Sequence, residues 1–180
     1  MANFYNVASN IPFLLLGILG VFHCRSFEAG SLKAAWLIFF LGIGLVSFGS
    51  AYYYLNPNNQ TLVWDRLPMT IVFVALFAAL LGEWVGPKVS QSALLLLVLI
   101  GLLSVLVWQF ADDLRLYVWV QFMPLLVIPT LLALYRKRYS HSYMLALAIL
   151  FYVLAKVLHA FDVEIFALLQ LVMAGHAIKH

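Results

Sequence analysis

The sequence is short of charge and has only one cysteine. Asp, Glu, Lys and Arg make up 9% of its 180 residues, whereas about a quarter of the residues of a soluble domain are charged. Hydrophobic residues make up 66%, and the mean hydropathy is +1.03. These values exclude a soluble fold and predict an integral membrane protein. Cys24 has no second cysteine to pair with, so an intramolecular disulfide is excluded.

Two further features are missing. The formal charge of +3 comes from basic residues scattered along the chain, so no basic stripe is available for nucleic acid. No basic segment precedes the first apolar run, so we expect that run to be a retained helix and not a cleaved signal peptide.

Long apolar runs fill the rest of the chain. They approach the length of about 20 residues that a transmembrane helix needs, and they lack the alternation of a membrane β-barrel. We therefore expect an all-α, polytopic bundle of seven transmembrane helices that forms one domain over residues 1–180. The expected helices cover about residues 4–23, 32–55, 64–84, 89–110, 114–135, 142–158 and, from near 162–166, the chain to residue 180.

The charges in the connections predict an orientation. The first, third and fifth connections carry basic residues, and the even connections carry mainly acids. Positive loops remain in the cytoplasm, so we expect the N-terminus outside and the C-terminus inside.

A polar cluster is expected where the second and third helices meet. Ser50 and Tyr54 are four residues apart and share a helix face, and Asp65 lies across the connection, at the start of the next helix. Simpler readings stay open: Asp65 favoured by the dipole of a helix N-terminus, Ser50 as a packing contact, and Tyr52 and Tyr53 as part of an interfacial aromatic belt.

A second polar cluster lies at the C-terminus. His176 and His180 are also four residues apart, so both rings can bind one metal ion from one side of a helix. A hydrolytic zinc site takes three protein ligands and a water. Asp65 could hold that water and move its proton, and Ser50 could stabilise an oxyanion. The alternative is a pair of polar residues at a helix end.

These residues resemble a known family. Asn6–Asn10 opens an apolar helix, Ser50 precedes Asp65 by fifteen residues within Trp64–Met69, and Gly175–His180 closes the chain. This combination is similar to bacterial members of the alkaline ceramidase family, within the CREST superfamily of seven-helix membrane hydrolases. The resemblance implies a zinc-dependent amide hydrolase of a bacterial inner membrane that splits ceramide-like lipids into a fatty acid and a sphingoid base.

The resemblance also implies roles for single residues. His176 and His180 correspond to two zinc ligands, Asp65 to the acid that works with the water, and Ser50 to the serine beside it. Tyr54 stands where the family has its third histidine ligand, and a phenolate is its means of binding zinc. His159 is the candidate substitute.

Other expectations follow from the positions at which this chain differs from the family pattern. The eukaryotic enzymes of the family hold calcium through acids before the first helix, and this chain has Asn3 where the last of those would fall, so we expect no intact calcium site. The alternative function is a lipid-binding member of the same fold that has lost catalysis through the change at Tyr54. A transporter or haem protein is less consistent with the sequence, which shows no inverted repeats.

Overall fold

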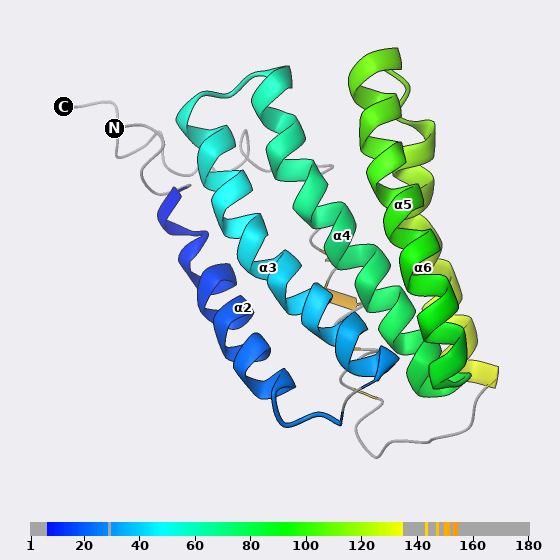
Figure 1. Ribbon diagram of the computed structural model, residues 1–180. Helices are drawn as coiled ribbons and strands as arrows, with labels where there is room; N and C mark the ends of the chain where they lie inside the picture. The colour runs from blue at the N-terminus through cyan, green and yellow to red at the C-terminus, as the bar shows by residue number, and fades with distance from the viewer. Residues whose placement is uncertain are drawn as a thin grey trace, which may run out of the picture. The chain divides into compact units, whose positions relative to one another are not determined.

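The computed structural model describes residues 7–28 and 30–134, together with six single positions between 143 and 154. The chain divides into two compact units, Met1–Tyr135 and Arg136–His180. In the described part of the first unit every regular element is helical (Figure 1). The elements are α2 (Ile11–Cys24), α3 (Ser31–Leu55), α4 (Asn59–Trp84), α5 (Pro87–Ala111) and α6 (Arg115–Leu134).

The second unit is described at few positions. Those positions are helical and fall inside the helix expected at 142–158: Tyr143, Leu147, Leu150, Phe151, Val153 and Leu154. The expected seventh helix lies outside the described residues, as do His159, His176 and His180. The prediction of seven spans and that of the orientation therefore stay predictions.

Three of the described helices are long and apolar enough to cross a membrane: Leu32–Leu55, Asn59–Trp84 and Pro87–Ala111. Along α5, large apolar side chains at helical spacing are exposed, among them Leu96 at 59%, Leu99 at 54% and Leu103 at 54%. Exposed leucines on a regular helix face are suited to lipid and not to water. The helices thus confirm that this is a membrane protein.

The first helix begins later than the sequence suggested. Residues 7–8 are helical, but the regular helix α2 starts at Ile11, after a turn at Ser9 and Asn10. Pro12 lies in the first turn of α2, where a missing N–H costs nothing. The Asn10 carbonyl accepts the first bonds, from the N–H groups of Phe13 at 3.1 Å and Leu14 at 3.3 Å.

The helix α4 starts five residues earlier than expected, at Asn59 and not at Trp64. The reason is a capping box, in which the Asn58 side chain accepts from the N–H groups of Gln60 and Thr61, both at 2.9 Å. The Thr61 hydroxyl oxygen in turn accepts from the N–H of Asn58 at 3.1 Å. Such reciprocal bonds satisfy the free N–H groups of a helix start, so the polar segment folds as helix.

Because α4 starts earlier, Asp65 and Pro68 lie inside the helix and not in its first turn. Asp65 is the seventh residue of α4, so the expectation that it opens the helix, and the reading of it as a helix-dipole residue, are wrong. Pro68 lies inside α4 and not in its first turn. A proline there removes the hydrogen bond to the carbonyl four residues before it, which is that of Trp64.

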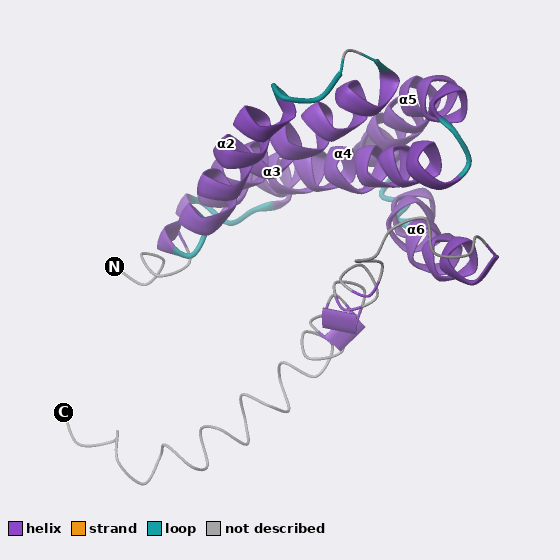
Figure 2. Cartoon of the chain, turned by 90° about the horizontal axis from the view of Figure 1, so that it is seen from below, coloured by secondary structure: helices purple, strands orange, loops and turns teal. Residues whose placement is uncertain are grey.

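The helices of the first unit pack in chain order. The helix α3 packs between α2 and α4, and α4 also contacts α5 and α6 (Figures 1 and 2). Small side chains at the centre, Ala35, Ala78 and Ala79, are fully buried. Small residues let helix backbones approach closely, which is how membrane helices gain packing energy.

The contact of α2 with α3 depends on a glycine. A Cβ at Gly17 would lie 2.6 Å from the Gly44 nitrogen and 2.9 Å from the Phe40 carbonyl oxygen. We therefore expect Gly17→Ala to destabilise the protein by about 2 kcal/mol through overpacking, measured by thermal unfolding in detergent. Gly44→Ala is the matched control, because a Cβ there would lie 4.0 Å from the Gly17 α-carbon. Equal destabilisation by both would contradict the prediction.

Candidate functional site

Ser50 and Asp65 lie at one depth on neighbouring helices. Ser50 is five residues before the end of α3, and Asp65 is six residues after the start of α4. At 1.5 Å per residue, both therefore lie about 8 Å from the connection that joins the two helices. The Ser50 hydroxyl, buried at 7% exposure, donates a hydrogen bond to Asp65 Oδ1. The structure thus brings together the first two predicted site residues.

Tyr54 lies one turn beyond Ser50 on α3 and is half-buried. Its phenol is close enough to Asp65 for an electrostatic interaction. Its ring centroid lies 5.5 Å from that of Tyr53. The three residues expected near the α3–α4 connection therefore lie near one another, with the Asp65 carboxylate bonded to the Ser50 hydroxyl and within electrostatic reach of the Tyr54 phenol.

Sequence reasoning missed a second group of residues, around Arg66. The guanidinium carbon of Arg66 lies 5.0 Å from the ring centroid of Trp108 on α5 and 4.9 Å from that of Tyr117 on α6. The two rings are 8% and 4% exposed, and Arg66 Nε is buried without a hydrogen-bond partner among the described residues. Such cation–π contacts are worth about 0.5–2 kcal/mol.

This group ties α4 to α5 and α6 beside Asp65. A signal for it was present, because an arginine inside a predicted span needs a partner. Trp108 lies three residues before the end of α5, and Tyr117 two residues after the start of α6. Their similar distance from the α5–α6 connection places the two rings at one depth.

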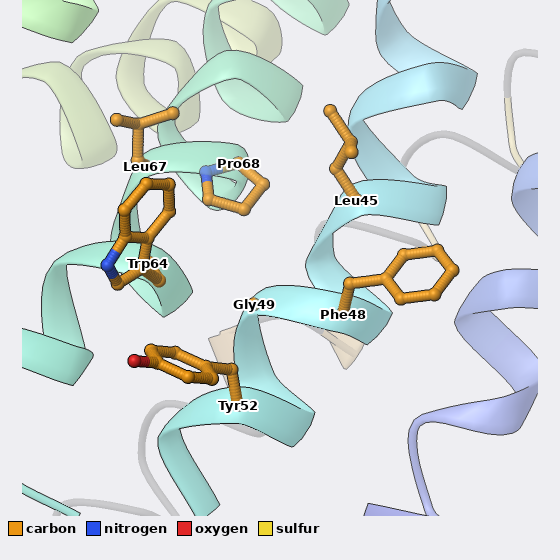
Figure 3. Close-up of a pocket in the computed structure, with 7 residues that line it drawn as sticks. All are labelled: Leu45, Phe48, Gly49, Tyr52, Trp64, Leu67 and Pro68. Atoms are coloured by element: carbon orange, nitrogen blue, oxygen red, sulfur yellow. The ribbon is translucent and has the colours of Figure 1, made fainter.

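An apolar groove of about 450 Å³ runs along the seam between α3 and α4. Figure 3 shows the rings of Tyr52 and Trp64 on facing helices, with Phe48 and Leu45 further along α3. Gly49 and Trp64, which also line it, are the chain neighbours of Ser50 and Asp65. The full lining is Leu45, Phe48, Gly49, Tyr52, Trp64, Leu67 and Pro68. Its carbon-rich walls suit a hydrocarbon chain.

The described residues do not by themselves form a zinc site. Among residues 7–28 and 30–134 no three His, Cys, Asp or Glu side chains lie close enough to share a metal ion. Asp65 and Tyr54 offer oxygen donors, and zinc also takes imidazole nitrogen. The expected imidazoles of His176 and His180 lie outside the described residues. Zinc binding therefore stays a prediction.

No curated protein and no solved structure matches the chain. A family model described as Ceramidase matches residues 1–178, a range that includes Ser50, Asp65 and His176. The family resemblance inferred from the sequence is thereby confirmed. The chain belongs to the ceramidase family.

Proposed function

We propose that the protein is a zinc-dependent intramembrane hydrolase that splits the amide bond of ceramide-like lipids into a fatty acid and a sphingoid base. The observation that carries the proposal is the hydrogen bond from the Ser50 hydroxyl to Asp65 inside a membrane-spanning helix pair. Polar groups within a span are costly and are functional by default. We further propose the full seven-span bundle, with the N-terminus outside and residues 1–180 as one domain of a bacterial inner membrane.

Asp65 is the proposed general base. Oδ1 accepts the Ser50 hydrogen bond, so Oδ2 is left to hold a water and take its proton. The water oxygen bonds to the amide carbon, the C–N bond then breaks, and the proton passes from Asp65 to the leaving nitrogen. The Ser50 hydroxyl can turn to donate to the oxyanion that forms.

The proposed metal shell consists of His176, His180 and Tyr54. Zinc in that shell supplies a Lewis acid that lowers the pKa of water towards neutrality. The protein itself keeps the reacting groups in place, since Ser50 and Asp65 come from helices with long packed lengths. No calcium site is part of the proposal.

The first test is fatty-acid release from a short-chain ceramide by detergent-purified protein, with zinc measured in the same sample. We expect a stoichiometric amount of zinc, and Ser50→Ala should lower the rate about 100-fold through loss of an oxyanion donor. Ser47→Ala is the matched control, because the buried Ser47 donates to the Gly44 carbonyl, at 2.8 Å on its own helix. Equal rates for Ser50→Ala and Ser47→Ala would reject the role of Ser50.

A second candidate is a lipid-binding member of the family without catalysis. Tyr54 in place of a histidine and the apolar groove of about 450 Å³ favour it. That reading predicts a bound acyl chain in the purified protein, no zinc and no release of fatty acid. Mass spectrometry of extracted lipid, together with metal analysis, separates the two candidates.

A further inference from the structure

The two catalytic helices touch backbone to backbone one residue away from the Ser50–Asp65 pair. A Cβ at Gly49 would collide with the carbonyl oxygen of Trp64 and would lie 2.9 Å from its carbonyl carbon. It would also lie 3.2 Å from Pro68 Cγ. Real Cβ atoms are not found so close to backbone, so only glycine permits this crossing.

The Trp64 carbonyl at the crossing lacks its regular helix donor. In a regular helix the Trp64 carbonyl would accept from the N–H of residue 68. Residue 68 is a proline inside α4 and has no N–H to donate. The Trp64 carbonyl instead faces Gly49, whose Cα–H groups can approach it as weak donors. Pro68 removes the regular donor to the Trp64 carbonyl, and Gly49 lets α3 approach that carbonyl closely.

This contact fixes the spacing of the reactive pair. Ser50 follows Gly49 and Asp65 follows Trp64, so the residues that hydrogen-bond across the seam adjoin the two that touch. A side chain at position 49 would push α3 away from α4. The added distance would exceed the range over which the Ser50 hydroxyl can hydrogen-bond to Asp65.

We propose that Gly49 is a positioning residue, which with Pro68 holds the Ser50 hydroxyl against Asp65. The proposal concerns the spacing of the pair, and only its kinetic consequence rests on the proposed hydrolase function.

A first experiment measures the spacing without any activity. Ser50→Ala, Asp65→Ala and the double variant form a cycle in the unfolding equilibrium, measured by denaturant titration in mixed micelles. A hydrogen bond to a charged group predicts a coupling of about tenfold in the equilibrium constant with Gly49 present. In a Gly49→Ala background we expect the coupling to disappear, and in a Gly44→Ala background to persist. No coupling in the parent protein, or unchanged coupling in Gly49→Ala, would overturn the proposal.

A second variant covers the case in which Gly49→Ala does not fold. Pro68→Ala gives the Trp64 carbonyl its helix donor back and removes the reason for the contact. We expect Pro68→Ala to weaken the Ser50–Asp65 coupling severalfold. Coupling at the full parent value in Pro68→Ala would count against the proposal.

Steady-state kinetics distinguish a positioning role of Gly49 from a merely structural one. Gly49→Ala should lower kcat about as far as Ser50→Ala does, with KM nearly unchanged, and the double variant should lose nothing more. If the losses of kcat in Gly49→Ala and Ser50→Ala multiply in the double variant, Gly49 acts by another route. If the parent protein releases no fatty acid, the proposed function fails, while the unfolding cycle still decides the positioning role.

Discussion

Replacing Asp65 with asparagine is expected to lower fatty-acid release about a thousandfold, because the amide cannot take a proton from water. The amide oxygen still accepts the hydrogen bond that Ser50 gives to Asp65 Oδ1, and the side chain keeps its shape. The loss should therefore lie in kcat and not in folding. The measurement is the initial rate of short-chain ceramide hydrolysis, with thermal unfolding of the same preparation.

Asp113→Asn is the matched control for that variant. Asp113 lies between α5 and α6, where it accepts from the backbone N–H of Arg115 at 2.9 Å and its Nε at 3.2 Å. We expect a nearly unchanged rate for Asp113→Asn. Zinc content should stay at the parent level in Asp65→Asn, because Asp65 is proposed to act on water and not to bind the metal. More than a tenth of the parent rate in Asp65→Asn would show that another group is the base.

Tyr54→His is expected to raise zinc affinity at least about tenfold, equivalent to ~1.4 kcal/mol. A phenol gives up its proton only well above neutral pH, whereas an imidazole nitrogen binds zinc as the neutral ring. The variant therefore replaces a poor donor by a good one at a position beside Asp65. Zinc affinity is measured by competition with a chromophoric chelator, in protein first stripped of metal.

The control is Tyr53→His, the same exchange one residue earlier. Successive residues of a helix point about 100° apart, so a histidine at position 53 should leave zinc affinity unchanged. Equal affinity in Tyr54→His and the parent would mean that position 54 does not contact the metal. A gain in affinity and in rate together would favour the hydrolase over the lipid-binding candidate.

Hydropathy predicted the described helices well where the lipid boundary sets their ends. The expected ranges 32–55, 89–110 and 114–135 agree within two residues with α3, α5 and α6. It failed at the start of α4, because Asn58 and Thr61 cap a helix that begins in a polar segment. Capping bonds act at the level of single side chains, and an average over an apolar window cannot register them.

The site was predictable to the extent that helix spacing decides it. Ser50 and Asp65 lie on either side of one short connection at similar sequence distances from it, so sequence distance alone fixed their common depth, with Tyr54 one helix turn from Ser50. The stacking of Trp108 and Tyr117 on Arg66 depends instead on how α5 and α6 are rotated about their axes. That rotation is set by packing among three helices, which no local pattern contains.

The stacking of Arg66 also bears on the charge of its neighbour in the chain. Within the described residues the one ion pair joins Arg115 to Asp113, so Arg66 forms none with Asp65. Two opposite charges that adjoin in the sequence are thus directed to different helices, one to aromatic faces and one to a hydroxyl. In the proposed reaction, protonation of the Asp65 carboxylate would then break no salt bridge, and Arg66 would keep its contacts with Trp108 and Tyr117.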